Sequence, residues 1–174
     1  TVDYSSITVI GEGDTSGRLI VDLEDLATNT AIATIIGGNN DYLLDIENIE
    51  GTFNNDTIYG NLSDNTLNGN LGDDTFRGEG GNDYIDGGSG TDTVDYSYTN
   101  KRVKVDLSLS EGIVDTQTDL TFTSNDEKDT LISIENVIGG TNSDILIGNG
   151  FDNVLDGQLG DDTLVGGIGN DKLI

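Results

Sequence analysis

The chain has no cysteine, histidine or proline, and only 7 of its 174 residues are basic. Without cysteine there are no disulfides and no thiolate metal sites. Without histidine, the commonest ligands for zinc, copper and iron are also missing. The same two absences remove the common nucleophile and base arrangements of enzymes. The scarcity of lysine and arginine excludes nucleic acid and anionic membranes as main partners, because both require a basic surface.

Apolar residues are scarce as well. They make up 33% of the chain, below the roughly 45–50% of an ordinary globular domain. No apolar run approaches the roughly 20 residues of a membrane span, so we expect no membrane insertion. Together with a formal net charge of −26, this composition is typical of chains that cannot bury enough surface to fold alone. A multivalent cation would neutralise the charge, and the chain offers only hard oxygen ligands.

Glycine is abundant, with 25 residues, and it marks a nine-residue repeat. Five consecutive repeats fill residues 51–95, and four more fill residues 139–174. They read GTFNNDTIY, GNLSDNTLN, GNLGDDTFR, GEGGNDYID and GGSGTDTVD, then GGTNSDILI, GNGFDNVLD, GQLGDDTLV and GGIGNDKLI. Position 1 is always glycine. Position 8 is always apolar, and nine apolar residues in a row at one position have a chance of about one in 20,000 at this composition. Position 6 carries Asp56, Asn65, Asp74, Asp83, Asp92, Asp144, Asn153, Asp162 and Asp171.

A larger duplication contains the two arrays of repeats. Residues 1–5 (TVDYS) recur as residues 93–97, and residues 46–49 (IENI) recur as residues 134–137 (IENV). We therefore divide the chain into a first unit, residues 1–95, with a connector (1–50) and an array (51–95), and a second unit, residues 96–174, with a connector (96–138) and an array (139–174). Because both ends of the sequence fall inside this pattern, we expect it to be a piece of a longer parent chain with neighbouring domains.

The connectors alternate apolar and polar residues as β-strands do, for example at residues 31–35 and 120–123. No helical period with caps is present. Residues 41–43 (DYL) and 129–131 (DTL) resemble degenerate repeats. We therefore expect one continuous solenoid with longer, irregular turns. The alternative is a small β insertion that separates two rolls.

Each nonapeptide predicts a turn followed by a short strand. Positions 1–6 are rich in glycine, which permits positive φ, and positions 7–9 form a strand with position 8 pointing inward. Two nonapeptides complete one coil, so equivalent turns stack at the strand spacing of ~4.8 Å. The position-6 side chains then face each other as Asp56–Asp74, Asp74–Asp92, Asn65–Asp83, Asp144–Asp162 and Asn153–Asp171. We expect Tyr4, Tyr96 and Phe76 in the apolar core.

Facing carboxylates about 5 Å apart repel by ~3 kcal/mol at an effective dielectric of about 20. A Ca²⁺ between successive turns reverses this, because it takes about 6–8 oxygens in flexible geometry, which two carboxylates and the turn carbonyls can supply. Mg²⁺ demands a tighter octahedron and should substitute poorly. With one ion per facing pair, we expect at least five ions. The glycines whose turns would contribute are Gly69, Gly72, Gly78, Gly81, Gly87, Gly90, Gly157, Gly160, Gly166 and Gly169.

The pattern resembles the RTX (repeats-in-toxin) family, whose calcium-binding nonapeptide is G-G-x-G-x-D-x-U-x. Residues 87–94 and 166–173 match it at every defined position. Asn65 and Asn153 depart from it, and the first two repeats of each array have lost later glycines of the motif, so we expect weaker or empty sites there. The resemblance implies an all-β fold, a right-handed parallel β-roll or β-helix solenoid with two arrays and strand-rich connectors.

The resemblance also implies a bacterial protein that a type I system exports unfolded and that folds outside the cell or on its surface. At affinities of about 10⁻⁴–10⁻³ M, typical of extracellular modules, cytosolic calcium would leave the sites empty. A ten- to hundredfold excess of calcium over that affinity stabilises each site by about 1.4–2.7 kcal/mol. We therefore expect a disordered chain in chelator and β structure in calcium.

Three functions are open to such a module. The first is a non-catalytic structural and folding module of a secreted or surface-attached protein, such as an adhesin or exoprotein. The alternative is a carbohydrate-binding module of a secreted enzyme that modifies extracellular polysaccharide, where Lys101, Arg102 and Lys104 would meet an anionic glycan. The third is an autonomous enzyme, a calcium-assisted lyase that uses Arg18, Arg77 or Arg102.

Overall fold

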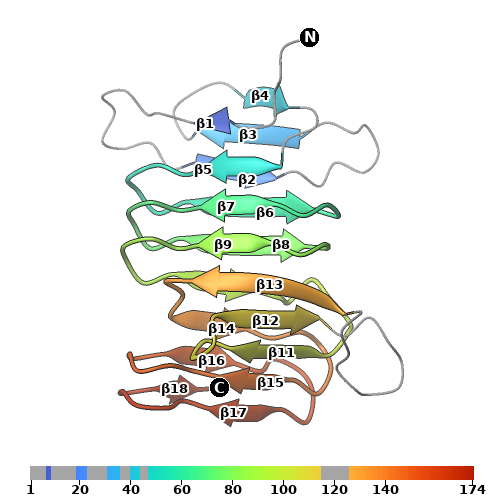
Figure 1. Cartoon of the computed structure of the whole chain (residues 1–174), viewed down its shortest axis with the longest axis vertical. Coiled ribbons are helices and arrows are strands. Elements are labelled where there is room, and N and C mark those ends of the chain that lie inside the picture. Colours follow the sequence, from blue (N-terminus) through green and yellow to red (C-terminus); the bar gives the residue numbers. More distant parts are fainter. Residues whose placement is uncertain (1–6, 9–18, 23–30, 36–39, 44–46, 115–125) are drawn as a thin grey trace.

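The computed structural model describes residues 7–8, 19–22, 31–35, 40–43, 47–114 and 126–174. These residues form two nine-stranded sheets that face each other along the long axis of the molecule (Figure 1). Among them we find no α-helix, and hence no helix with the length and apolar character of a membrane span. Tyr4, Arg18 and residues 120–123 lie outside the described residues. The fold is an all-β parallel β-roll, as the sequence predicted.

Consecutive strands of the arrays alternate between the two sheets. The first sheet contains, in spatial order, β1 (Ile7–Thr8), β5 (Asn48–Glu50), β7 (Thr66–Asn68), β9 (Tyr84–Asp86), β13 (Glu127–Ile132), β12 (Glu111–Val114), β11 (Val103–Asp106), β15 (Ile145–Ile147) and β17 (Thr163–Val165). The second contains β18 (Lys172–Leu173), β16 (Val154–Asp156), β14 (Asn136–Ile138), β10 (Thr93–Asp95), β8 (Thr75–Glu79), β6 (Thr57–Asn61), β2 (Leu19–Asp22), β3 (Ala31–Ile35) and β4 (Asn40–Leu43).

Parallel pairing between strands 18 residues apart confirms the predicted coil of two nonapeptides. Ile58 pairs with Phe76 in the second sheet, and Leu67 pairs with Ile85 in the first. In the second array, Leu146 pairs with Leu164. Each register places position 8 of one repeat directly on position 8 of the repeat 18 residues away, so these side chains stack in columns between the sheets.

The core consists of these stacked position-8 side chains. Seven of them are fully buried, namely Ile58, Leu67, Phe76, Ile85, Val94, Leu146 and Leu155. Burial of each such side chain stabilises the fold by about 1.5–3 kcal/mol. Leu164 is only partly buried and Leu173 is 48% exposed, although both continue the position-8 columns in register with Leu146 and Leu155. The reason is that β17 and β18 are the last strands of their sheets and have a neighbour on one side only.

The second connector joins the two arrays within the sheets. In the first sheet β13 pairs in parallel with β9, β12 runs antiparallel between β13 and β11, and β11 pairs in parallel with β15. In the second sheet β10 pairs directly with β14. The connector is therefore an antiparallel meander that extends one sheet, where the sequence predicted longer, irregular turns. Residues 129–131 take the place of a repeat, because Leu131 pairs with Ile85.

The first connector repeats this pairing in the opposite sheet. Val21 of β2 pairs with Ile58 in the second sheet, as Val105 of β11 pairs with Leu146 in the first. Strands β2, β3 and β4 form an antiparallel meander, like β11, β12 and β13. The sheet changes because the first array has an odd number of repeats and each repeat contributes one strand to alternate sheets. The sequence duplication is thus also a structural one.

Candidate metal centres in the stacked turns

Stacked turns bring the predicted position-6 side chains together in all five pairs. In each pair the backbone N–H of one residue donates to Oδ1 of the residue 18 positions later. The donor–acceptor distances are 2.7 Å for Asp56 to Asp74, 2.8 Å for Asp74 to Asp92, 2.8 Å for Asn65 to Asp83, 2.8 Å for Asp144 to Asp162 and 3.0 Å for Asn153 to Asp171. We call this series of bonds the position-6 ladder. All its members except Asp162 and Asp171 are buried.

The position-1 glycines leave room for oxygen atoms of the ladder. A Cβ atom built on Gly69 would lie under 3.0 Å from Oδ2 of Asp74 and from the carbonyl oxygen of Gly87. The same space beside Gly51 holds Oδ2 of Asp56 and the carbonyl oxygen of Gly69. An outer carboxylate oxygen and a carbonyl of the next turn thus converge where any other residue would place its side chain. Hard oxygen donors gathered in this way suit a calcium ion.

The nine turns fall into two geometric classes. Five have a left-handed residue at position 2 and a positive φ at a position-4 glycine, and we call them open turns. They are residues 69–74, 78–83, 87–92, 157–162 and 166–171, with position-4 glycines Gly72, Gly81, Gly90, Gly160 and Gly169. The other four, the closed turns, are residues 51–56, 60–65, 139–144 and 148–153. All four are described in full, and none of their residues has a positive φ.

In the closed turns the position-6 side chain bonds back to its own turn. The position-2 N–H donates to it in all four, at 2.5 Å for Thr52 to Asp56, 2.8 Å for Asn61 to Asn65, 2.6 Å for Gly140 to Asp144 and 2.9 Å for Asn149 to Asn153. Asp56 also accepts the Thr52 hydroxyl at Oδ1, and Asp144 accepts the Val103 N–H at Oδ1. Both oxygens of these two carboxylates are therefore satisfied by the protein.

Two carboxylates of open turns have no such partner. The Oδ2 atoms of Asp74 and Asp92 are buried and accept no hydrogen bond. The two side chains belong to residues that are 1% and 0% exposed. A buried oxygen without a partner costs about 1–3 kcal/mol, and more when it is charged. Protonation or a cation would offset this cost, and among the described residues no basic side chain bonds to either aspartate.

The pKa values of three carboxyls in the position-6 ladder are raised, as expected for buried acids with little positive charge nearby. Burial raises the pKa of Asp74 to about 7, and repulsion from Asp56 and Asp92 adds to the shift. Burial also raises the pKa of Asp92 to about 6, with repulsion from Glu135. In the closed turn, burial raises the pKa of Asp144 to about 6, although two backbone N–H groups oppose the shift. A divalent cation would restore the charged form of each group.

Two acidic residues that the nonapeptide pattern does not include continue the ladder across the junction between the arrays. The Asp83 N–H donates to Oδ1 of Asp129 at 3.0 Å, and the Asp92 N–H donates to Oε2 of Glu135 at 2.9 Å. Burial raises the pKa of both Asp83 and Asp129; repulsion from Asp129 adds to the shift at Asp83, whereas repulsion from Glu127 adds to it at Asp129. The recurring IEN segment and the DTL segment were the only signals for these two residues in the sequence.

Tyr96 contributes more than its predicted apolar bulk. Its ring is fully buried in the core, as expected, and its hydroxyl donates to Oδ2 of Asp129 at 2.7 Å. Oδ1 of Asp129 already accepts the Asp83 N–H. Asp129 is therefore satisfied on both oxygens by the protein, like the carboxylates of the closed turns.

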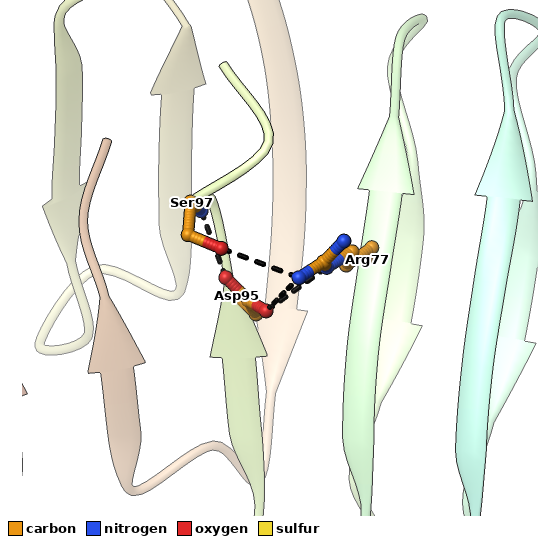
Figure 2. Close-up of polar contacts among 3 residues, drawn as sticks. All are labelled: Arg77, Asp95 and Ser97. Carbon is orange, nitrogen blue, oxygen red and sulfur yellow. Dashed lines mark hydrogen bonds and ion pairs between the residues drawn. The ribbon is translucent and has the colours of Figure 1, made fainter. Parts of the chain in front are cut away.

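Arg77, a candidate for the lyase alternative, is held in a contact between strands. Figure 2 shows its guanidinium beside Asp95 and Ser97. Nε and Nη2 donate to Oδ2 of Asp95 at 2.9 and 2.7 Å, and Nη2 donates to Oγ of Ser97 at 3.2 Å. The guanidinium carbon also lies 4.8 Å from the ring centroid of Tyr59. These contacts link β6, β8 and β10, so Arg77 supports the stacking of coils.

The donors at each candidate centre are the position-6 side chains of two turns, two acids in three pairs and an amide with an acid in the other two, together with backbone carbonyls. Within the part of the chain that the structure describes, no three acidic side chains converge on one point. Carbonyl oxygens and waters would therefore complete a coordination sphere, which suits Ca²⁺ better than Mg²⁺, because Mg²⁺ requires a tighter octahedron.

A comparison with known families matches the same residues. The profile of the RTX calcium-binding nonapeptide repeat matches residues 44–76, 59–94 and 138–173. With overlaps merged, these stretches span residues 44–94 and 138–173, half of the chain. No curated protein matches the sequence.

Proposed function

Because the chain belongs to the family of RTX calcium-binding nonapeptide repeats, we propose that it is a calcium-dependent structural and folding module of a secreted or surface-attached bacterial protein. The observation that carries the proposal is the pair of buried, unpartnered oxygens on Asp74 and Asp92. At neutral pH a bound cation would stabilise a fold that buries charge in this way. The module itself would carry no catalytic activity.

The best-supported ion position is between the turns of Asp74 and Asp92. There, Oδ2 of Asp74 and the Gly87 carbonyl oxygen converge beside Gly69, and Asp92 supplies the next carboxylate. The other position-6 residues and the turn glycines remain proposed ligands, and the count of at least five ions remains a prediction. The open turns are the favoured ligands, because the closed turns already satisfy their position-6 side chains.

Calcium would couple folding to arrival outside the cell. In the low calcium of the cytosol the repelling acids would keep the coils apart, and in external calcium each occupied site would stabilise the stack. We further propose that the two units, residues 1–95 and 96–174, act as one folding unit. Pairing of β9 with β13 and of β10 with β14 across the junction supports this.

The contacts of the basic cluster favour this proposal over the polysaccharide-binding alternative. Lys101 Nζ lies 3.6 Å from Oε2 of Glu127, so an acidic side chain partly neutralises the cluster. Arg102 acts on Asp144, whose pKa it lowers slightly against the larger effect of burial. An anionic glycan would have to compete with both acids.

A calcium titration followed by circular dichroism, with bound ions counted by equilibrium dialysis, tests the proposal. We expect little β structure in chelator, and a cooperative gain of β structure together with several bound ions in calcium. Mg²⁺ at the same concentration is the control and should give little of either. Full β structure in chelator, or no bound calcium, would contradict the proposal.

A further inference from the structure

The turn that stacks on the last turn of the first array is unusually short. Three residues, 133–135, connect β13 to β14, whereas six residues connect β7 to β8 and β9 to β10. The Gly87 N–H donates to the Ile132 carbonyl at 3.0 Å, as the Gly69 N–H donates to the Asp86 carbonyl at 2.9 Å. Ser133, with φ of 53°, therefore stands where a position-1 glycine would stand in a repeat. Glu135 stands at position 6, because Val137 pairs with Val94.

The short turn supplies the same set of oxygens as an open turn. A Cβ atom built on Gly87 would lie under 3.0 Å from Oδ2 of Asp92 and from the carbonyl oxygen of Ser133. Beside Gly69 the corresponding atoms are Oδ2 of Asp74 and the carbonyl oxygen of Gly87. Oε2 of Glu135 accepts the Asp92 N–H at 2.9 Å, as Oδ1 of Asp92 accepts the Asp74 N–H at 2.8 Å.

A buried atom points into this space without a partner. Asp92 is 0% exposed, and its Oδ2 accepts no hydrogen bond. The nearby charge of Glu135 is also negative, so the described side chains leave the oxygen uncompensated. The arrangement is the one found at Asp74, with Glu135 in the place of the next aspartate.

We propose that Asp92, Glu135 and the Ser133 carbonyl bind a calcium ion at the junction between the two units, outside the nonapeptide motif. The proposal rests on the calcium dependence proposed above. A glutamate suits this place because a turn of three residues brings less backbone toward the neighbouring coil, and the additional methylene restores the reach of the carboxylate. The ion joins β10 to β14 and so links the first array to the second unit.

Ion counting on variants of the full chain tests this site. In saturating calcium, Glu135→Gln should bind one ion fewer than the natural sequence, measured by equilibrium dialysis and by calorimetric titration. Glu47→Gln is the matched control, because Glu47 has the same place in the first IEN segment and precedes Asn65 as Glu135 precedes Asn153, but no nonapeptide aspartate comes before it as Asp92 comes before Glu135. It should bind the natural number of ions. An unchanged count and affinity for Glu135→Gln would overturn the proposal.

A crystal of the natural protein grown in calcium gives a second test that does not depend on whether the variant folds. Anomalous scattering from calcium should place a peak between Asp92 and Glu135. A peak between Asp74 and Asp92 with none at Glu135 would overturn the junction site alone. The absence of bound calcium anywhere would instead contradict the proposed function.

Discussion

Closed turn 51–56 and open turn 69–74 stack directly on each other, yet they satisfy their buried aspartates in different ways. Asp56 accepts the Thr52 N–H, whereas Oδ2 of Asp74 accepts nothing. Both aspartates take part in the same ladder bond at 2.7 Å. The comparison teaches that the ladder alone does not create a need for calcium. The need arises in turns whose position-2 N–H does not donate to the position-6 carboxylate.

The backbone conformation of the position-2 residue explains why its N–H does not donate to position 6 in open turns. Asn70 has φ of 73°, and its N–H donates to the side chain of Asn68, two residues earlier, at 3.0 Å. The Gly88 N–H likewise donates to Asp86 at 3.1 Å. The left-handed conformation thus directs the N–H away from position 6. This conformation occurs only in the turns that have glycine at position 4. The residue at position 4 therefore determines whether the position-6 carboxylate is satisfied by the position-2 N–H or is left to bind a cation.

The largest expected effect is on the pH dependence of the metal-free chain, where the open turns have no compensation. Folding raises the pKa of Asp74 from 3.8 to about 7 and that of Asp92 to about 6. The folded state therefore binds more protons than the unfolded state between these values, and stability must fall as the pH rises from about 4 to about 7. Several such groups together change the free energy of unfolding by several kcal/mol, because each tenfold change in a proton-binding constant corresponds to roughly 1.4 kcal/mol.

Because little β structure is expected in chelator alone, urea unfolding at pH 4.5, 6 and 7.5 is followed in chelator with a fixed concentration of the osmolyte trimethylamine N-oxide, which favours the folded state. The chelator measurements on the variants below use the same osmolyte. Calcium should reverse the trend with pH, because the ion binds only the deprotonated carboxylates and protons compete with it at low pH. Stability in chelator that is independent of pH over this range would mean that the buried acids are compensated without metal.

The next largest effect is expected at position 4 of the turns. Gly90 has φ of 150°, and a Cβ atom there would lie under 3.0 Å from the Gly72 carbonyl oxygen. Gly90→Ala should therefore cost about 1–3 kcal/mol of strain in saturating calcium, measured by chemical denaturation. The control is Ser63→Ala at position 4 of a closed turn, where the residue is exposed and the expected change is within about 0.5 kcal/mol. Equal losses for the two variants would remove the distinction between the classes.

A smaller effect, whose sign depends on calcium, is expected at position 6. In a ten- to hundredfold excess of calcium, Asp74→Asn should lose about 1.4–2.7 kcal/mol with the lost ion. In chelator the same variant should be more stable than the natural chain, since it removes a buried, uncompensated charge. Thermal unfolding in both conditions measures the reversal.

Asp56→Asn is the matched control for this reversal. Asparagine already occupies position 6 of two closed turns, where Asn65 and Asn153 accept the position-2 N–H. The variant should therefore change stability by no more than about 1 kcal/mol, with the same sign in both conditions. A reversal of sign at Asp56 would show that the closed turn also holds an ion.

The sequence predicted the parts of the fold that repeat. The nine-residue period predicted the columns of Ile58, Phe76 and Val94, the pairing of Asp74 with Asp92 and the coil of 18 residues. The missing glycines separated the first two repeats of each array from the rest. That separation coincides with the two classes of turn, although the reason for it, an internal N–H donor, requires backbone dihedral angles.

Features outside the nine-residue repeat were not predicted from the sequence. Alternation of apolar and polar residues identifies strands but not their direction, so the antiparallel strand β12 was missed. Asp129 and Glu135 lie 46 and 43 residues from the aspartates that they meet, and no fixed period connects such pairs. The exposure of Leu173 depends on the end of a sheet, which a local pattern does not reveal.

The smallest expected effect concerns the hydroxyl that helps to close the first turn. Thr52 Oγ1 donates to Oδ1 of Asp56 at 3.0 Å and accepts the Asn54 N–H at 3.1 Å. Thr52→Val keeps the shape and the backbone N–H but removes both bonds, so it should cost about 0.5–1.5 kcal/mol in calcium and in chelator alike. Thr66→Val, at an exposed strand position, is the control and should change stability by a few tenths of a kcal/mol, as surface substitutions do. If the loss at Thr52 appeared only in calcium, the first turn would depend on an ion as the open turns do, and the internal donor would not be what distinguishes it.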